Sequence, residues 1–409
     1  AVNFNDFFVW TNIQEHEKIQ KSIDVGFSAI AEQIQTYYEK TKDLKAIETL
    51  NKYERKYQAY IKKPIIDTSE MDYDSSGEVV FPNKDIIFVP QRFKALIYKN
   101  NMQLEQEVWK EYEERDNIGK FISDILRHSK VGELPLLILG LPGAGKSLLC
   151  NMLAAKILFH EYHVIIIKLR DTIADETINQ QINQQMKRDF SNSCTWDDIA
   201  ESGINKPVLL IFDGYDELLQ ASGRTYSDYI KKIAEFQKDQ KSIYNIFVKC
   251  IVTSRTTLID KALIMDNTPV IRLSDFDAER IDVWSKIWNE NNKIFFQKNQ
   301  LDYFEIDKRS KVYELAKQPL LLMMLALYDS NGNTLKKQRN MNSTQLYYSL
   351  IREFISREKR KSEKFRSKQE SEQQKIIDEE VRKISIAAIG MYNRRALYIR
   401  SIEFQSDIE

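Results

Sequence analysis

A glycine-rich segment holds the residues whose types and spacing are best suited to chemistry. It reads Gly140-Leu141-Pro142-Gly143-Ala144-Gly145-Lys146-Ser147, and it lies between the apolar run 136–139 and a helix expected from Leu148 onward. Glycines let the backbone curl so that successive N–H groups converge on one anion, and the start of the next helix adds the positive end of its dipole. Lys146 can neutralise the β- and γ-phosphates, and the Ser147 hydroxyl can bind Mg²⁺. Residues 140–148 therefore predict a phosphate-binding loop for a nucleoside triphosphate.

A magnesium ion held by phosphates and a hydroxyl also needs a carboxylate, and Asp213 is placed to supply it. Asp213 follows the apolar residues 208–212, so it should emerge at the carboxyl end of a buried strand, where sheets of this class bind ligands. Asp216 and Glu217 follow closely, and one of them could orient or deprotonate an attacking water, although such carboxylates also cap helices. Arg255 ends a further apolar run, and it could contact the γ-phosphate or form a surface ion pair. The predicted catalytic residues are therefore Lys146, Asp213, Asp216, Glu217 and Arg255.

Four apolar bursts must position these side chains. They are separated by long polar stretches with helical periodicity, and they cover 136–139, 164–167, 208–212 and 247–252. Continuous apolar strands that alternate with helices are typical of a parallel sheet covered on both faces. We therefore predict an α/β P-loop NTPase core with a central parallel sheet, flanked by an N-terminal helical region and a C-terminal helical region.

Changes in composition divide the rest of the chain. Apolar residues spaced three and four apart before residue 63 predict amphipathic helices, and a run of Asp, Ser, Glu and Gly at 67–78 predicts a linker. In the charged run 356–382, acidic and basic residues are interleaved, which favours a solvated helix over a nucleic-acid surface. The expected domains are an N-terminal helical region at 1–66, a linker at 67–90, the NTPase core at 91–273, a helical domain at 274–345, and a charged helix followed by the start of another domain at 346–409.

Overall composition argues against several classes of function. Lys and Arg number 60 and Asp and Glu number 60 among 409 residues, so no net charge draws the whole chain to nucleic acid or acidic membranes. The 3 cysteines are widely spaced and the 4 histidines include no i, i+4 pair, which indicates neither a disulfide framework nor a zinc site. No apolar run reaches the roughly 18 residues that span a bilayer. These features predict a cytoplasmic protein, and the start at Ala1 and end at Glu409 predict a piece of a longer chain.

Four motifs together resemble the NACHT family of signal-transduction NTPases, within the class called STAND. The motifs are the loop 140–147, Ile167-Lys168-Leu169-Arg170-Asp171, Leu210-Ile211-Phe212-Asp213-Gly214-Tyr215-Asp216-Glu217-Leu218, and Thr253-Ser254-Arg255. The order Asp-Gly-aromatic-Asp-Glu is the most specific of them, because other phosphate-loop families usually place the acidic residues next to each other. The resemblance covers about residues 115–348 and extends to bacterial members that act in defence against phage.

The resemblance implies roles for individual residues. Lys146 and the loop amides would hold phosphates, Ser147 and Asp213 would hold Mg²⁺, and Arg255 would sense the γ-phosphate. In relatives a proline of the following helical domain touches the nucleotide, and Pro319 is the candidate here, although Lys317 stands where many relatives have Gly. A winged-helix domain follows in relatives, and residues 383–388 resemble its early helix. A C-terminal sensor and a recognisable N-terminal effector, which relatives carry, are absent from this sequence.

The expected function is a nucleotide-controlled switch in immune or antiphage defence. Such a switch binds ATP or ADP with Mg²⁺, hydrolyses ATP slowly, and forms homo-oligomers when an unknown ligand activates it; neither a membrane nor a nucleic acid is an expected partner. A turnover ATPase acting as a motor or remodelling enzyme, and a scaffold with a structural nucleotide, are the alternatives. ATP is favoured over GTP by the resemblance and because no Asn-Lys-x-Asp element follows the fourth strand. Phe88, Val89 and Pro90 are candidates to pack on the adenine.

Overall fold

The computed structural model describes residues 44–66, 79–100, 102–104, 107–128, 133–191, 194–222, 227–337, 343–360, 362–394 and 399–408. The helices expected before residue 44 and residues 67–78 of the expected linker lie outside these ranges. The chain divides into two compact units. The first contains residues 44–61, 90–142 and 146–274, and the second contains residues 62–89, 143–145 and those from 275 onward.

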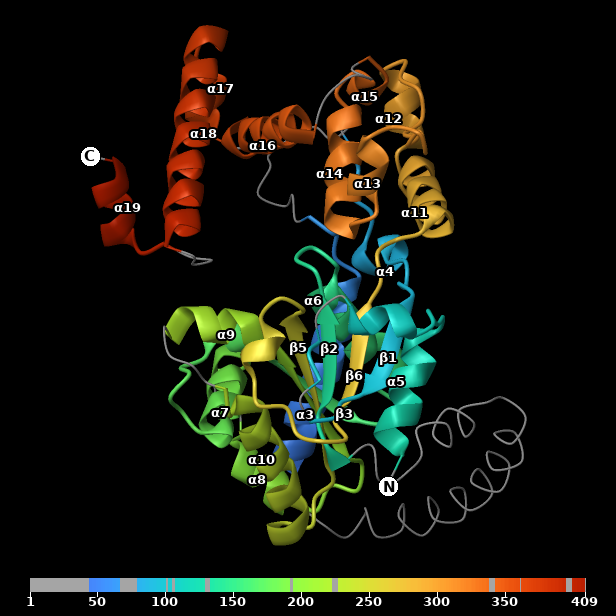
Figure 1. Ribbon diagram of the computed structural model, residues 1–409, viewed down its shortest axis with the longest axis vertical. Coiled ribbons are helices and arrows are strands. Elements are labelled where there is room, and N and C mark those ends of the chain that lie inside the picture. Colours follow the sequence, from blue (N-terminus) through green and yellow to red (C-terminus); the bar gives the residue numbers. More distant parts are fainter. Residues whose placement is uncertain are drawn as a thin grey trace. The chain divides into compact units, whose positions relative to one another are not determined.

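The first unit is built on a six-stranded sheet with the strand order β1-β6-β2-β5-β4-β3 (Figure 1). The four bursts of apolar sequence form its parallel strands β2 (Leu136–Gly140), β3 (His163–Lys168), β4 (Val208–Asp213) and β5 (Val248–Arg255). All five residues of β2 are buried, as are the first five of β3 and of β4. Strands that are apolar on both faces require helices on both, so the α/β fold predicted from the sequence is confirmed.

Helices and short turns of the first unit connect and cover these strands. Their bounds are α3 (Leu44–Ile61), η1 (Val108–Glu111), α5 (Ile118–Arg127), α6 (Lys146–Met152) with the π-helical continuation η3 (Leu153–Ile157), η4 (Leu169–Asp171), α7 (Ile178–Asp189), α8 (Trp196–Glu201), α9 (Tyr215–Ser222), α10 (Tyr229–Ile243) and η5 (Ile259–Lys261). α3 packs along the edge strand β3, where the Tyr57 hydroxyl accepts a hydrogen bond from the N–H of Ile166 at 2.8 Å. An edge strand leaves backbone groups unpaired, and Tyr57 satisfies one of them.

Two strands of the sheet were missed by the sequence prediction. β6 (Pro269–Leu273) runs parallel to β2, and β1 (Phe93–Ile97) pairs antiparallel with β6, placing Lys94 opposite Arg272. Like charges directly opposite each other destabilise a sheet. Both cations have partners at Trp109, however. Lys94 donates to its carbonyl oxygen at 2.8 Å, and the Arg272 guanidinium lies 5.9 Å from the centre of its ring.

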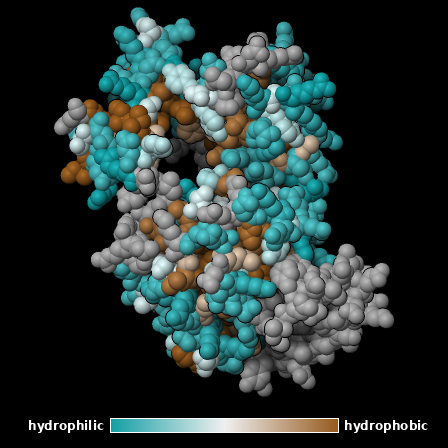
Figure 2. Space-filling view, viewed as in Figure 1, coloured by the Kyte–Doolittle hydropathy of each residue, from teal (hydrophilic) through white to brown (hydrophobic). Residues whose placement is uncertain are grey.

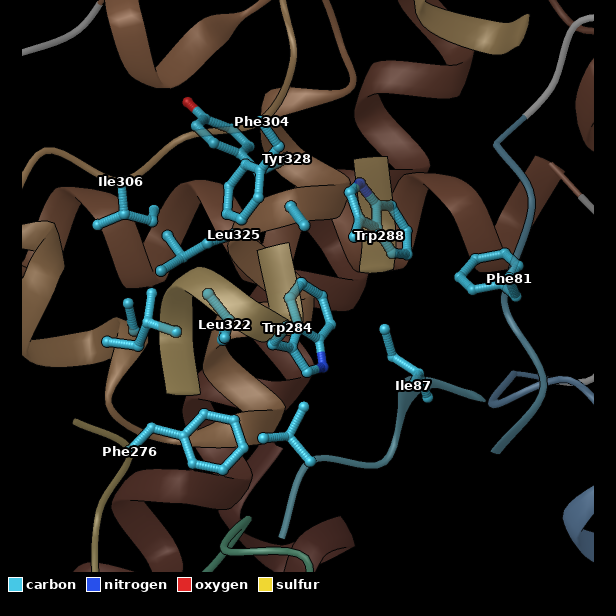
Figure 3. Packing of buried hydrophobic residues seen from close by; sticks show 14 of the residues in the cluster. Phe81, Ile87, Phe276, Trp284, Trp288, Phe304, Ile306, Leu322, Leu325 and Tyr328 are labelled. Carbon is cyan, nitrogen blue, oxygen red and sulfur yellow. The ribbon is translucent and has the colours of Figure 1, made fainter. Parts of the chain in front are cut away.

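The described helices of the second unit are α4 (Lys84–Ile87), α11 (Ala278–Asn291), α12 (Lys293–Lys298), α13 (Val312–Ala316), α14 (Pro319–Asp329), α15 (Thr334–Lys337), α16 (Ser343–Arg360), α17 (Glu363–Arg366), α18 (Glu370–Asn393) and α19 (Ser401–Ile408). The helices from α4 to α16 pack around one apolar core (Figure 3), and a separate small cluster joins α16 to α17 and α18. Trp284 and Trp288 stack at the centre with ring centroids 5.7 Å apart. Phe81 and Ile87 pack in the same core, so residues far apart in the chain complete one helical unit.

The last two helices form a closely packed pair with an apolar surface. Arg394 donates two hydrogen bonds to the Asp407 carboxylate, both at 2.7 Å, and a Cβ at Gly390 would clash with that carboxylate. Apolar side chains are nevertheless exposed on both helices. Tyr392 is 83% exposed and Ile402 is 78% exposed, and Figure 2 shows hydrophobic residues gathered on the surface where α18 and α19 lie in Figure 1. Such patches often mark surfaces of interaction.

Candidate nucleotide-binding site

The loop between β2 and α6 turns at two glycines. Gly143 has a φ of 74° and Gly145 a φ of 84°, a left-handed backbone that residues with a Cβ adopt at a cost. A Cβ on Gly145 would meet no atom within 4 Å, so it is the backbone conformation that requires glycine there. β2 lies between β6 and β5, so the loop leaves the sheet near its middle. The loop therefore has the left-handed glycines and the position after a central strand that are typical of a phosphate-binding loop.

Lys146 begins α6 and lies close to the predicted carboxylates. Its ammonium donates hydrogen bonds to the carbonyl oxygens of Gly140 at 2.9 Å and of Leu141 at 3.2 Å. Burial lowers the pKa of Lys146, and the negative charges of Asp216 and Asp213 oppose that lowering. Because such effects weaken with distance, they place both carboxylates near the ammonium. The structure thus brings together residues that lie about 70 positions apart in the chain.

Asp213 is the last residue of β4, and a threonine of β5 orients its carboxylate. The Thr253 hydroxyl donates a hydrogen bond to Oδ1 of Asp213 at 2.6 Å and accepts one from the N–H of Gly214 at 2.9 Å. Thr253 is fully buried, so water does not compete for these contacts. The hydroxyl therefore fixes the direction of the Asp213 side chain through one of its two oxygens.

The oxygen donors at this edge of the sheet fit a hard divalent cation. Ser147 is exposed in the first turn of α6 and supplies a hydroxyl, and Asp213 supplies a carboxylate. The pKa of Cys150, on the same helix as Ser147, is raised mainly by burial and also by the negative charge of Asp213. Mg²⁺ is usually bound through one or two protein oxygens together with phosphates and water. Within the described ranges, no group of three or more His, Cys, Asp or Glu side chains is arranged to hold a metal ion. The residues therefore fit Mg²⁺ that binds together with a nucleotide.

Arg255 forms an ion pair with the buried carboxylate of Asp216. Nε of Arg255 lies 2.7 Å from Oδ2 of Asp216, and the backbone N–H of Arg255 donates to Oδ1 at 3.1 Å. The Asp216 side chain is 3% exposed, so its carboxylate is desolvated and held at both oxygens. The strand register places Arg255 beside Gly140, where the loop begins. The backbone of Arg255 therefore lies beside the start of the loop, and its charge is partly balanced by Asp216.

Glu217 differs from Asp216 in its surroundings. Burial raises the pKa of Glu217, the charge of Asp216 raises it further, and the charges of Arg170 and Arg255 oppose the rise. Its carboxylate lies next to Gly214, because a Cβ on that glycine would be 3.2 Å from it. A half-buried carboxylate with a raised pKa is a suitable acceptor for a proton from water. Of the two adjacent carboxylates, Glu217 is therefore the better candidate to orient or deprotonate water.

The comparison with protein families agrees with this geometry. Residues 136–273, from the first residue of β2 to the last of β6, match the model of the ATPase family associated with various cellular activities (AAA). This segment is an AAA-type P-loop NTPase domain. The match supports nucleotide binding and ATPase activity in the domain. A comparison with curated proteins gave no match.

Two residues of the AAA-type domain were not assigned a role from the sequence. Thr253 was seen as part of a motif, but its contact with Asp213 depends on the pairing of β4 with β5, which a strand pattern does not reveal. Arg170 follows β3 in η4, and its charge acts on Glu217. The signal for Arg170 was its place two residues after the end of a buried strand.

Two further predictions concern Pro319 and the segment 88–90. Pro319 occupies the first turn of α14, where its fixed φ and missing N–H suit a helix start, and its contact with a nucleotide stays a prediction. Val89 is buried in the apolar core of the second unit, so its side chain has a packing role there. The packing of Phe88, Val89 and Pro90 on adenine stays a prediction.

No helix in the described part of the chain has both the length and the apolar character to cross a membrane.

Proposed function

We propose that the protein is a nucleotide-controlled signalling switch of the NACHT type, acting in immune or antiphage defence. The AAA-type domain would bind ATP, with Lys146 and the loop amides on the phosphates and with Ser147 and Asp213 on Mg²⁺. The ion supplies charge neutralisation at the phosphates when it is bound. Glu217 would orient the attacking water, and Arg255 would sense the γ-phosphate.

The ion pair of Arg255 with the buried Asp216 carboxylate carries the proposal of slow hydrolysis. An arginine accelerates phosphoryl transfer when its charge is directed at the transferring group. Here the guanidinium is 2.7 Å from a carboxylate that is 3% exposed, so much of its charge is balanced within the protein. Arg255 is thus better suited to reporting the presence of a γ-phosphate than to rapid catalysis. We expect turnover well below the roughly 10 s⁻¹ that is typical of enzymes.

A switch also needs a form that associates with other copies. The exposed apolar side chains on α18 and α19 support this part of the proposal, because burying them would favour association. A nucleotide shifts such an equilibrium only if it binds the two forms with different affinity. We therefore propose that ADP favours the monomer and ATP favours a homo-oligomer.

The experiment measures the mass of the purified protein in solution with ADP and with a non-hydrolysable ATP analogue, together with the rate of ATP hydrolysis. The proposal expects a larger mass with the analogue and slow hydrolysis. Lys146→Ala should lose ATP binding in calorimetry and show one mass under both conditions. Equal ATP affinity of the wild type and Lys146→Ala would refute the loop assignment.

A turnover ATPase, acting as a motor or remodelling enzyme, is the second candidate, and the match to a family described as ATPases favours it. Sustained hydrolysis near 10 s⁻¹, with the same mass under both nucleotides, would support this candidate over the switch. A scaffold with a structural nucleotide would instead retain bound nucleotide, hydrolyse none of it and keep one mass.

A further inference from the structure

Three buried side chains connect the start of α9, where Asp216 and Glu217 lie, to α10 and α7. Tyr215, which precedes Asp216, stacks on Tyr229 of α10 with ring centroids 5.7 Å apart and ring planes 12° apart. The Tyr229 hydroxyl donates a hydrogen bond to Oε1 of Gln181 on α7 at 2.5 Å. Tyr215 and Gln181 are fully buried, and Tyr229 is 2% exposed. The three side chains therefore connect α9, α10 and α7 out of contact with water.

Gln181 extends this connection to the backbone of the segment after β3. Its Nε2 donates hydrogen bonds to the carbonyl oxygens of Ile173 at 3.1 Å and of Glu176 at 3.4 Å. One turn further along α7, Oε1 of Gln185 accepts a hydrogen bond from the N–H of Lys168 at 3.1 Å. Two buried glutamines of one helix thus hold both ends of the segment 168–176.

This segment carries the arginine that acts on Glu217. Arg170 lies in η4, which packs against α9, and its charge opposes the rise in the pKa of Glu217. The Arg170 side chain is 61% exposed, so its own contacts do little to fix it in place. The backbone that the glutamines hold must therefore set where its charge lies relative to Glu217.

We propose that Tyr229 and Gln181 are positioning residues for ATP hydrolysis, which hold the segment 168–176 in a fixed relation to Asp216 and Glu217. The inference rests on the proposed role of Glu217 in orienting water. Burying the Tyr229 hydroxyl and the Gln181 amide costs desolvation free energy, whereas Phe and Leu at these two positions would fill the interior without that cost. The polar groups instead fix relative positions, because a hydrogen bond holds its partners at a defined distance and angle. The hydroxyl does so between α10 and α7, and the amide does so between α7 and the segment 168–176.

Tyr229→Phe and Gln181→Met test the proposal from the two sides of one hydrogen bond. Each variant should hydrolyse ATP roughly tenfold more slowly, because small displacements of catalytic groups are costly, and should keep its ATP affinity within about twofold. The acidic limb of the pH–rate profile should also move to higher pH. If Arg170 is no longer held near Glu217, burial raises the pKa of Glu217 with less opposition. A defect in folding alone would not move that limb.

Gln240→Met is the matched control, because it removes a similar buried bond from the same helix. Oε1 of Gln240 accepts a hydrogen bond from Nε1 of Trp196 at 2.9 Å, three turns along α10 from Tyr229. It should lower thermal stability as Tyr229→Phe does and leave the hydrolysis rate and its pH profile unchanged. The proposal is overturned if Tyr229→Phe and Gln181→Met keep the wild-type rate and profile, or if Gln240→Met changes both to the same extent. A wild type with no hydrolysis above that of Lys146→Ala would instead refute the proposed function.

Discussion

Removing the Thr253 hydroxyl should lower the stability of the first unit and weaken Mg²⁺ binding at the proposed site. Thr253→Val keeps the shape of the side chain and deletes two contacts: the donor to Asp213 at 2.6 Å and the acceptor for the N–H of Gly214 at 2.9 Å. A hydrogen bond to a charged group contributes about 1.5–3 kcal/mol, and a buried N–H left without a partner costs about 1–3 kcal/mol. Asp213 and Gly214 are only partly buried, so water compensates in part. The expected loss is about 3 kcal/mol, or roughly 10 °C in Tm.

The effect of Thr253→Val on function should appear as a change in the Mg²⁺ concentration that ATP hydrolysis requires. Groups that orient a metal ligand typically change metal affinity about 10- to 100-fold when they are removed. We therefore expect the Mg²⁺ concentration for half-maximal ATP hydrolysis to rise about tenfold in Thr253→Val, whereas nucleotide binding in EDTA should not change. Thermal unfolding and a Mg²⁺ titration of hydrolysis measure the two effects.

Two variants of the same strand end serve as controls. Thr253→Ser keeps the hydroxyl and should retain most of the Mg²⁺ affinity. Thr256 is also buried, but its Oγ1 has no hydrogen-bond partner among the described residues, so Thr256→Val should be neutral or stabilising. If Thr253→Val matches Thr256→Val in both stability and Mg²⁺ dependence, the assigned role of the hydroxyl is wrong.

Three other substitutions have definite expected outcomes. Burial and the charge of Asp216 raise the pKa of Glu217 in the fold, so its ionisation disfavours the folded state at neutral pH. Glu217→Gln should therefore abolish hydrolysis yet raise Tm at pH 7.5, and that gain should vanish as the pH falls below the carboxyl's ordinary range; a gain that persists there would contradict the assignment. Tyr57→Phe leaves the Ile166 N–H without its partner and should cost about 1–2 kcal/mol, measured by urea unfolding, with faster amide exchange at Ile166 as the specific sign. Gly390→Ala should separate α18 from α19, because the added Cβ would clash with the Asp407 carboxylate; amide exchange in α19 should increase, and unchanged exchange would show that the helices adjust.

The central strands and the loop could be predicted because local sequence determines them. β2 and β4 consist of apolar residues that end in a glycine or an acidic residue, and both patterns can be read without knowing their neighbours. β1 and β6 could not be predicted in that way. Each carries a cation, and the partners of Lys94 and Arg272 lie at Trp109, in another part of the chain. The strand character of these segments depends on tertiary contacts that the sequence pattern does not contain.

The division of roles between Asp216 and Glu217 was also beyond prediction, and the sheet order explains it. Successive helical residues point about 100° apart, so two neighbours at the start of α9 face different surroundings. β4 lies between β5 and β3, and each of those strands is followed or ended by an arginine. Asp216 faces β5 and pairs with Arg255, whereas Glu217 lies in the field of Arg170 beyond β3. Two carboxylates that look equivalent in the sequence thus have different surroundings, because α9 follows the strand that lies between the two arginines. Asp216 is the buried partner of Arg255, which we propose as the γ-phosphate sensor, and Glu217 is the half-buried carboxylate that we propose as the acceptor for water.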